Sequence, residues 1–319
     1  MTALSHDEAA RVPAPAAGAD LSAGMLLALV AAATFGLSGA LGRGLMDAGW
    51  SPGAAVTARV CVGALALLPA SLRALRGRWH LLRDNLAFLA LFGLVSVAGC
   101  QLAFFLAVTE LQVGVALLVE YTAPVAIVGW LWLRYDHRPG RLTVTGGGLA
   151  LLGLVLVLDL TGGASVSLVG LGWALLAMLA VSSYFVLGAQ RTGSLPPIAL
   201  AGGGLVVGAA ALAVAGLVGL LPLTVGTAAV SFSPGVVPWW VVVLALGVLT
   251  AALSYTAGIA ATRRLGSRLA SFVALSEVLA AVVWAWLLVG ELPHPVQLLG
   301  GVLVVAGVVV VKLGETPGR

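Results

Sequence analysis

The sequence contains very little charge for its length. Asp, Glu, Lys and Arg make up 9% of the 319 residues, whereas 61% are hydrophobic and the mean hydropathy is +1.12. A water-soluble core cannot bury that much apolar surface, so we predict an integral membrane protein whose outer surface contacts the lipid bilayer. The isoelectric point near 9.6 does not indicate nucleic acid binding, because the basic residues stand between apolar runs, where anionic lipid and topology explain them.

Groups that carry metal, redox or nucleotide chemistry are also scarce. The two cysteines, Cys61 and Cys100, lie inside predicted spans and are interpreted as small buried residues. The histidines fall in the N-terminal tail or in loops: His6, His80, His137 and His294. The sequence contains no Walker loop and no Rossmann glycine pattern. We therefore expect no metal site, no cofactor and no enzymatic activity, and any energy input must come from an ion gradient.

Ten apolar segments are long enough to cross a bilayer core of about 30 Å, which takes roughly twenty helical residues. They follow a tail, residues 1–21, which lacks the basic start of a secretory signal and is expected to be disordered. The predicted spans are 22–45, 53–72, 86–108, 112–133, 142–160, 168–189, 197–220, 237–261, 268–289 and 296–313. Residues 221–236 are uncharged and contain Pro222 and Pro234, which leaves open a partly re-entrant segment there.

The cationic residues predict the direction of insertion, because short loops rich in Lys and Arg stay in the cytoplasm. If residues 1–21 are cytoplasmic, fourteen of the sixteen Lys and Arg residues fall in cytoplasmic segments, and the exceptions are Arg43 and Arg59. Both termini, including a short tail at 314–319, are therefore predicted to be cytoplasmic. The expected location is a bacterial-type plasma (inner) membrane.

An internal repeat organises the chain. Residues 93–157 and 247–311 align without a gap at an offset of 154. Residues that are rare in so apolar a chain share this register: Trp130 with Trp284, Trp132 with Trp286, Pro139 with Pro293, Gly93 with Gly247, Gly146 with Gly300, and Gly153 with Gly307. We interpret the chain as two copies of one five-helix unit, 22–160 and 168–313, joined by a linker at 161–167.

An odd number of helices per copy makes the second copy enter the membrane from the side opposite to the first. The predicted fold is thus all-α, with ten transmembrane helices in two inverted five-helix repeats. Inverted repeats can exchange conformations, which provides a route to alternating access around a substrate site near the bilayer midplane. The Gly-rich stretches of the fifth and tenth spans are interpreted as packing positions, with a homodimer seam as the alternative.

Short stretches of the sequence also resemble a known family. The fourth span reads Glu-Tyr-Thr-Ala-Pro at 120–124, and the ninth reads Leu-Ser-Glu at 275–277 and ends in Gly-Glu-Leu at 290–292. With the two five-helix copies, these features resemble the EamA family of the drug/metabolite transporter superfamily, and most of all its threonine/homoserine exporter-like branch. The resemblance implies an inner-membrane carrier that exports small metabolites or amino acids, often with proton exchange. The chain departs from the family pattern at Val278, where a proline is usual, and at 134–136, where Arg-Tyr-Asp replaces Gly-Glu.

Two acidic residues are predicted to lie inside the membrane, where a charge costs about 2.5 to 3.5 kcal/mol. Glu120 lies near the middle of the fourth span, and Glu277 lies about as deep in the ninth. They are three residues away from equivalent positions of the repeat, and a three-residue step returns to nearly the same helix face. We expect both carboxyl groups to face one cavity and to bind a substrate amine or carry a coupling proton. Structural carboxyl groups hydrogen-bonded between helices are the alternative.

Arg59 is the third charged residue at this depth. It lies about seven residues into the second span, too far from the helix end to reach the outer surface easily. It is a candidate to clamp a substrate carboxylate or to pair with Glu120, which would make its burial tolerable. If Arg59 and Glu120 both reach the cavity, their opposite charges suit a zwitterion such as an amino acid.

Aromatic residues at similar depth are candidates for lining the cavity, although such residues more often serve packing: Phe35, Phe104, Phe105, Tyr121, Tyr184, Phe185, Tyr255 and Phe272. Tyr121 and Tyr255 are the stronger candidates, because a buried phenol needs a polar partner. Pro124, one turn beyond Glu120, has no backbone donor and would free the Glu120 carbonyl. We expect either a local helix break or a plain kink there.

These features together predict a secondary active transporter that exports small, amino-acid-like metabolites by alternating access, with proton coupling as part of the hypothesis. Two alternatives stay open. One is an uncoupled facilitator. The other, from a different class, is a membrane scaffold or sensor without flux, in which the acids at mid-depth would be replaceable by glutamine.

Overall fold

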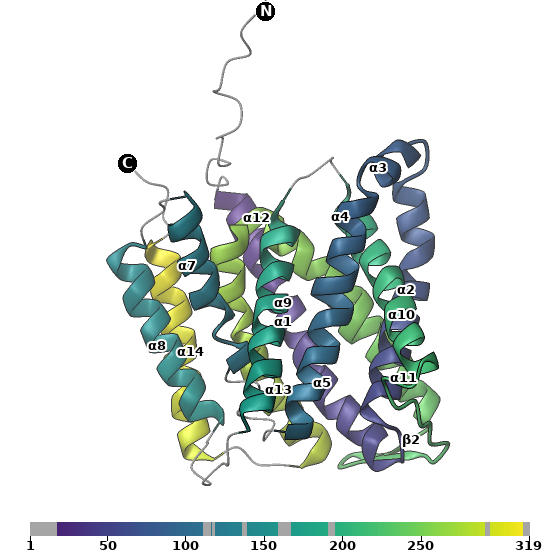
Figure 1. The fold of residues 1–319 in the computed structure, drawn as a ribbon. Coiled ribbons are helices and arrows are strands. Elements are labelled where there is room, and N and C mark those ends of the chain that lie inside the picture. The colour runs from purple at the N-terminus through teal and green to yellow at the C-terminus, as the bar shows by residue number, and fades with distance from the viewer. Residues whose placement is uncertain are drawn as a thin grey trace, which may run out of the picture.

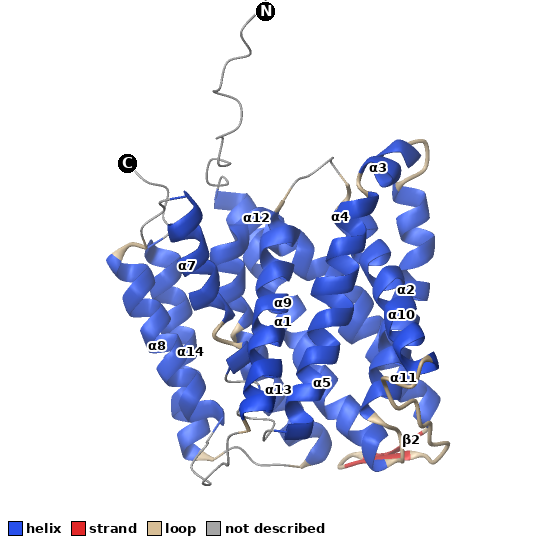
Figure 2. Ribbon diagram, viewed as in Figure 1, coloured by secondary structure: helices blue, strands red, loops and turns tan. Residues whose placement is uncertain are grey.

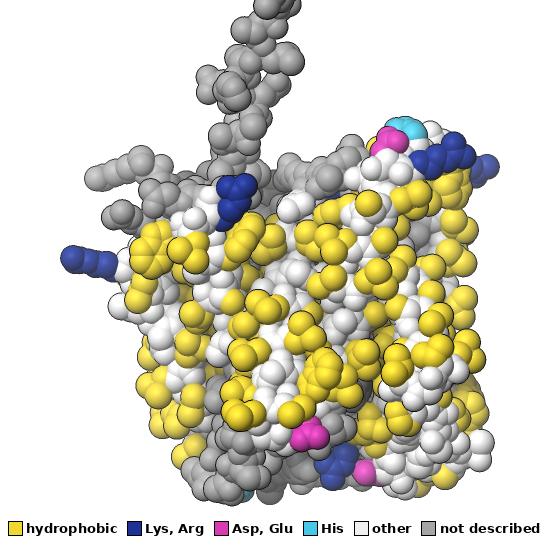
Figure 3. Space-filling view, in the orientation of Figure 1, with side chains coloured by type: hydrophobic (Ala, Val, Ile, Leu, Met, Phe, Trp, Pro, Cys, Tyr) yellow, Lys and Arg dark blue, Asp and Glu magenta, His cyan; other side chains and the backbone are white. Residues whose placement is uncertain are grey.

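The structure of the chain is a computed structural model that describes residues 18–110, 116, 119–135, 139–158, 167–190, 195–290 and 294–314. Most of the predicted tail at 1–21, linker at 161–167 and tail at 314–319 therefore lies outside the described residues. The described part is a bundle of helices that run between two opposite ends (Figure 1). Hydrophobic side chains cover the flanks of the face shown in Figure 3, and charged side chains gather near its two ends. The chain is thus an all-α membrane protein.

The helices follow one another with short connections. Those of the first half are α1 (Gly18–Asp47), α2 (Pro52–Ala74), α3 (Trp79–Asp84), α4 (Leu86–Leu91), η1 (Phe92–Gly99), α5 (Cys100–Glu110), α7 (Ala123–Tyr135) and α8 (Arg141–Leu158). Those of the second half are α9 (Leu168–Ala189), α10 (Pro197–Leu217), α11 (Trp239–Gly247), η3 (Val248–Leu253), α12 (Ser254–Ala274), α13 (Ser276–Trp284), η4 (Ala285–Val289) and α14 (Pro295–Gly314). The segments η1, η3 and η4 are π-helical turns, which leave some backbone carbonyls without their usual partners.

Length and composition separate these helices into two groups. Within the described residues, six helical stretches are long and apolar enough to cross a membrane: Leu21–Asp47, Pro52–Ala74, Leu86–Phe104, Leu168–Ala189, Pro197–Leu217 and Trp239–Ala274. Four further apolar helices are shorter: Ala123–Arg134, Arg141–Leu156, Ser276–Leu288 and Leu298–Gly314. A bundle with so many apolar helices requires a lipid environment, because lipid is the only solvent that does not penalise its exposed apolar side chains.

Local chemistry explains where several helices begin. The Ser51 hydroxyl accepts a hydrogen bond from the Ala54 backbone amide at 3.2 Å, and Pro52 occupies the first turn, where its missing amide hydrogen is not needed. Ser167 caps α9 in the same way. α1 begins at Gly18, so the helix includes the last residues of the tail that we predicted as disordered.

The predicted boundary between the eighth and ninth spans lies at one glycine. Gly266 has φ of 78° and ψ of 163°, a backbone conformation that side chains with a Cβ atom rarely adopt. The chain therefore reverses inside α12, and the residues after Gly266 continue towards α13. The ninth span is interrupted again at Leu275, which the sequence pattern did not predict.

A short hairpin, and not a re-entrant segment, follows α10. β1 (Val230–Phe232) pairs antiparallel with β2 (Gly235–Val237), and the Val230 and Phe232 side chains pack against α1 at Gly44. Figure 2 places the hairpin at the end of the bundle where α1 ends. We call this end the hairpin face. The opposite end, where α1 begins, carries the cationic last turns of α2, α7 and α14, with Arg73, Arg134 and Lys312, and we call it the cationic face (Figure 1).

The glycines of α8 and α14 bring these two helices into close contact. A Cβ atom at Gly146 would lie 2.7 Å from the Gly307 carbonyl oxygen, and one at Gly153 would lie 2.6 Å from the Gly300 carbonyl oxygen. The early residue of one helix thus faces the late residue of the other, so α8 and α14 are antiparallel neighbours (Figure 1). These glycines serve packing within the chain, as small residues commonly do between membrane helices.

Replacement of Gly307 by alanine should destabilise the protein, because its Cβ atom would lie 2.6 Å from the Gly146 carbonyl oxygen. Such overpacking costs about 1 to 3 kcal/mol of unfolding free energy. Gly148→Ala on α8 is the matched control, since no atom lies within 4 Å of a Cβ atom there. Thermal unfolding in detergent, followed by circular dichroism, measures both variants. Equal stability of the two variants would contradict the packing of α8 on α14.

Candidate functional site

A cavity of about 460 Å³ lies in the interior of the helical bundle. Its wall is formed by α1, α2, η1, α5, α9, α11, α12 and α13, together with Glu120 and Tyr121. Towards the hairpin face the lining includes Arg43, Met46 and Pro52, which stand where α1 ends and α2 begins. Towards the cationic face the α1 lining stops at Ala28. The lining thus extends to the hairpin face at α1 and α2, and towards the cationic face it reaches Phe185 of α9 and Thr262 of α12.

Helix interruptions lie beside both acidic residues of the cavity. The helix that contains Glu120 is interrupted by a turn at residues 121–122, and α7 starts at Ala123, one residue before Pro124. The other interruption lies at Leu275, two residues before Glu277. In the alignment of the two repeats, Leu275 is equivalent to Tyr121. Because Pro124 has no backbone amide hydrogen, the Glu120 carbonyl has no partner one turn further on. Each acid therefore stands next to a break in a helix at mid-depth.

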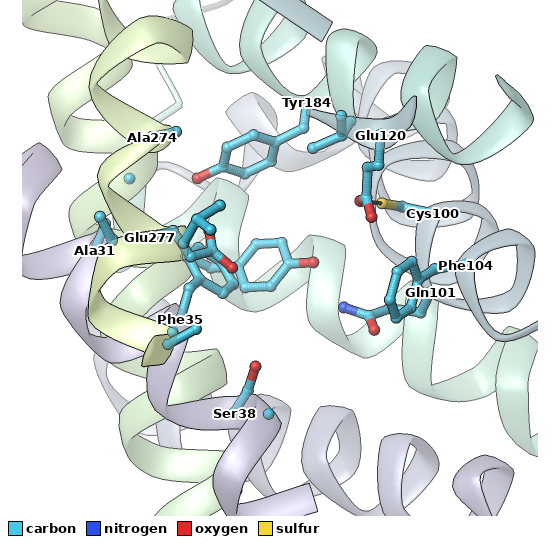
Figure 4. A pocket seen from close by; sticks show the side chains of 18 of the residues that line it. Ala31, Phe35, Ser38, Cys100, Gln101, Phe104, Glu120, Tyr184, Ala274 and Glu277 are labelled. Carbon is cyan, nitrogen blue, oxygen red and sulfur yellow. Dashed lines mark hydrogen bonds between the residues drawn. The ribbon is translucent and has the colours of Figure 1, made fainter. Parts of the chain in front are cut away.

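Glu120 has few partners in the cavity wall. Its side chain is half-buried, and its carboxyl oxygen Oε1 accepts a hydrogen bond from the Cys100 thiol at 3.6 Å. Figure 4 shows the Glu120 and Glu277 side chains projecting into one space from different walls. A thiol is a weak hydrogen-bond donor, so most of the hydrogen-bonding capacity of Glu120 is left for another group.

Glu277 is held by groups from other helices. Its side chain is half-buried, and its carboxyl group accepts a hydrogen bond from the Tyr121 hydroxyl. Electrostatic interactions connect it with Arg59 as well as with Glu120. Gly36 of α1 packs against the backbone at the start of α13, where a Cβ atom would lie 2.7 Å from the Glu277 carbonyl oxygen. Glu277 is thus positioned by contacts with α1 and the fourth span and is attracted by the charge of Arg59 on α2.

Arg59 is almost completely buried, with 7% of its surface exposed. Its Nη2 atom donates a hydrogen bond to the Thr250 carbonyl oxygen at 2.6 Å, and its guanidinium carbon lies 5.7 Å from the centre of the Phe35 ring. Thr250 belongs to the π-helical segment η3, whose widened turn frees carbonyl groups for such contacts. The guanidinium group is therefore bound by a backbone dipole and by an aromatic face.

Among the described residues, Arg59 forms a close ion pair neither with Glu120, the partner that the sequence suggested, nor with Glu277. Within the residues that the structure describes, the ion pair closer than 4.0 Å joins Arg43 to Asp47 at the hairpin face, at 3.4 Å. The charged group that interacts with Arg59 is Glu277. The hydrogen bond to Thr250 holds the guanidinium group beside η3 of the second repeat.

Aromatic rings cover much of the remaining wall. The Tyr255 ring packs edge-to-face against Phe35 and Tyr184, with centroid distances of 5.3 and 5.6 Å. The Tyr255 hydroxyl forms a hydrogen bond with the Gln101 side chain. The Tyr184 hydroxyl is buried without a hydrogen-bond partner and lies over Gly258, where a Cβ atom would not fit.

The structure brings five of the sequence-predicted site residues together: Glu120, Glu277, Arg59, Tyr121 and Tyr255 all line the cavity. Phe272 is wrong as a lining candidate, because it is 2% exposed in the core and packs near Gly147. The Phe105 side chain lies outside the described residues.

Sequence reasoning missed Cys100 and Gln101 as polar groups of the site. One signal was available, because the repeat register aligns Cys100 with Ser254, whose hydroxyl bonds Thr34 at 2.7 Å. The polar role of this position is therefore common to both halves. No comparable signal marks Gln101, which aligns with Tyr255, a residue of a different size and shape.

An all-helical membrane protein with an acidic cavity that reaches one face has the architecture of a membrane transporter. The model of the EamA-like transporter family matches residues 22–159 and again residues 168–313. The chain belongs to this family, so it is a transporter and not an enzyme.

The chain is also similar to a named exporter and to a protein of known structure, at 28% and 20% sequence identity. The threonine/homoserine exporter RhtA of Escherichia coli (strain K12) is 28% identical over 299 residues, which cover 92% of this chain and 90% of the exporter. The same exporter from Escherichia coli O157:H7 matches with the same identity and coverage. A solved crystal structure superimposes with a TM-score of 0.71 and 20% identity over 92% of this chain and 97% of that chain. This last likeness concerns the fold alone.

Chemical labelling tests the side to which the cavity extends. Cys100 lines the cavity and Cys61 does not. In a Cys61→Ser variant, we expect a small membrane-impermeant thiol reagent to modify Cys100 faster from the hairpin face than from the cationic face. The Cys100→Ser variant, which retains Cys61, measures the background. Mass spectrometry of protein in sealed vesicles of known orientation gives both rates. Faster modification from the cationic face would contradict the described shape of the cavity.

Proposed function

We propose that this protein is a secondary active exporter of small, amino-acid-like metabolites. It works by alternating access of two inverted five-helix repeats. The observation that carries the proposal is the presence of Glu120 and Glu277 in one cavity that extends to one face of the bundle. Ionisable groups at mid-depth are costly in a membrane and usually mark the path of a substrate or an ion.

Matching contacts in the two halves support the inverted arrangement of ten spans. When two repeats are related by a two-fold axis, each contact between them has a counterpart. If residue A of the first repeat contacts residue B of the second, then the equivalent of A in the second repeat contacts the equivalent of B in the first. Gly146 with Gly307 and Gly153 with Gly300 form such a pair, since each glycine of α8 has its equivalent on α14.

A second set of equivalent contacts lies at η1 and η3, which start near Gly93 and Gly247. A Cβ atom at Gly93 would meet Val207 of α10, and one at Gly247 would meet Val62 of α2. The π-helical turns themselves fall at matching places of the repeat. Two copies that share close contacts and backbone irregularities can exchange conformations with each other.

Cation placement supports an orientation with both termini in the cytoplasm. The cationic face would then be cytoplasmic, and the hairpin face would be on the other side of the membrane. The cavity extends to the hairpin face, so this conformation is the outward-facing one of the proposed cycle. Release of substrate outwards is what an exporter needs in this state.

The substrate class follows from the relative and from the wall. RhtA carries the name of a threonine and homoserine exporter, and this cavity combines carboxyl groups with aromatic and aliphatic surface. Carboxyl groups in such a setting can take up and release protons, because burial disfavours their charged form. We therefore include proton exchange in the proposed mechanism.

A flux assay tests the function and its coupling. In sealed vesicles with purified protein, amino acid flux should increase several-fold when a pH gradient is imposed, because a proton gradient is the proposed energy source. We expect Glu120→Gln and Glu277→Gln to reduce this flux by at least about tenfold, since each would remove a charge-assisted contact.

The matched control is Glu110→Gln, at the exposed end of α5 and outside the cavity lining, which should leave the flux unchanged. Flux that is independent of the pH gradient would contradict the proposed coupling and indicate an uncoupled facilitator. Absence of flux for every substrate, with glutamine variants indistinguishable from the parent, would replace the proposal by a membrane scaffold or sensor.

A further inference from the structure

The charges at mid-depth of the cavity are not evenly matched, because the other base of its lining, Arg43, stands near the hairpin face and pairs with Asp47. Two acidic side chains, Glu120 and Glu277, and one deeply placed base, Arg59, line it. We propose that Glu120 is the group that binds a substrate ammonium ion, whereas Arg59 and Tyr121 only position Glu277. The cavity would then accept organic amines with an apolar body whether or not they carry a carboxylate. This inference rests on the proposed transport function and makes its substrate class more specific.

Two of the three guanidinium nitrogens of Arg59 are occupied or buried in this structure, which limits its use as a carboxylate clamp. One nitrogen of its guanidinium group is bound to the Thr250 carbonyl oxygen, and the Phe35 ring lies beside the group. The Nε atom has no hydrogen-bond partner, but it is fully buried, so a ligand in the cavity does not reach it. A bidentate contact needs two adjacent nitrogen atoms presented together. Because Nε is buried, the pair of nitrogen atoms that includes Nε cannot make a bidentate contact with a ligand in the cavity.

Glu277 already has a nearby positive charge and a hydrogen bond. The Arg59 guanidinium group of α2 attracts Glu277 without a close ion pair, and the Tyr121 hydroxyl supplies the hydrogen bond. Both groups belong to the half of the chain opposite to that of Glu277 itself. A buried charge with such partners is stable where it is, and removal of one partner leaves an uncompensated charge. Glu277 is therefore part of the support of the site.

Glu120 lacks equivalent support. Its hydrogen-bond partner is the Cys100 thiol, at 3.6 Å from Oε1, and among the described residues it has no cation within 4.0 Å. The half-buried carboxyl group projects into the cavity (Figure 4). An ammonium ion offers three donors and a full positive charge, so it supplies what this carboxyl group lacks.

The rest of the wall suits an apolar body. Phe35, Tyr184 and Tyr255 form a continuous set of ring contacts, and small residues such as Ala31, Gly258 and Ala274 leave room beside them. Aromatic faces also attract cations. A volume of about 460 Å³ falls in the range of cavities that hold drug-sized ligands, so aromatic amines fit the site by size.

Three ligands with the same ring separate the two modes of recognition. Phenylalanine carries both charges, 2-phenylethylamine carries the ammonium group only, and 3-phenylpropionate carries the carboxylate only. We measure binding to the purified protein in detergent by calorimetry, because neutral amines cross bilayers unaided. The amine should bind within about threefold of phenylalanine, and the carboxylate at least about tenfold more weakly. Stronger binding of the carboxylate than of the amine would overturn the proposal.

Variants assign the roles of the individual residues. Glu120→Gln should weaken phenylalanine and 2-phenylethylamine alike, by about tenfold or more. Arg59→Gln should weaken both ligands by equal factors, since Arg59 acts through Glu277. A selective loss of phenylalanine in this variant would instead show a carboxylate clamp and overturn the proposal.

A double variant keeps the test valid if Arg59→Gln lowers stability. Because Arg59 compensates Glu277, the combined Arg59→Gln and Glu277→Gln protein should unfold at a higher temperature than Arg59→Gln alone and should regain amine binding. A double variant that is less stable than both single variants, and that binds no amine, would contradict the positioning role of Arg59.

The outcomes for binding and for transport are distinguishable. Amine binding that depends on Glu120, together with absence of flux in vesicles, would refute the transport function and leave the binding assignment intact. Flux of 3-phenylpropionate but not of phenylalanine would leave a transporter and refute the amine assignment.

Discussion

The structure depends on one constraint: a charged or polar group inside an apolar bundle must have a partner, because neither lipid nor packed side chains can solvate it. Arg59 shows how the constraint acts. Its guanidinium group lies at the level of η3, where the Thr250 carbonyl oxygen is free to accept its hydrogen bond. The acids follow the same rule, since Glu277 contacts Tyr121 and Glu120 contacts Cys100.

Helix irregularities are the means by which the bundle satisfies this requirement. A regular α-helix uses almost all of its backbone carbonyls internally, so it offers little to a neighbouring polar side chain. The π-helical segments η1 and η3 and the interruptions at residues 121–122 and 275 occur beside the cavity, at places where polar side chains gather. The regular helices α8 and α14 lie further from the site and pack through glycines instead. The regular helices thus form the scaffold of the bundle, and the irregular segments surround the site.

The two halves share backbone features but differ in the chemistry that they contribute. Gly93 and Gly247 make corresponding contacts in the two halves, whereas Arg59 has no charged counterpart on α10. A duplicated scaffold can exchange conformations, and a wall that differs between its two sides can still bind a substrate in one orientation. We regard this combination as the physical basis of the proposed transport cycle.

Sequence alone determined the features that depend on local pattern. Hydropathy predicted a membrane protein and the approximate helix positions, the repeat register predicted corresponding elements, and depth along the helices predicted that Glu120 and Glu277 share a cavity. These properties follow from bilayer thickness and helical periodicity, which act over a few turns of chain.

Only the tertiary structure decided which groups are partners. Arg59 and Thr250 are separated by 191 positions, and nothing in the local pattern of either helix states that they meet. The same holds for Tyr121 with Glu277 and for the hairpin that packs on α1 at Gly44. Partner choice depends on how helices distant in the chain are placed against one another, and on small backbone irregularities that direct a carbonyl group sideways. For that reason the pairing of Arg59 with Glu120 was a reasonable expectation from charge and depth, whereas the three-dimensional arrangement gives Arg59 the Thr250 carbonyl oxygen as its hydrogen-bond partner.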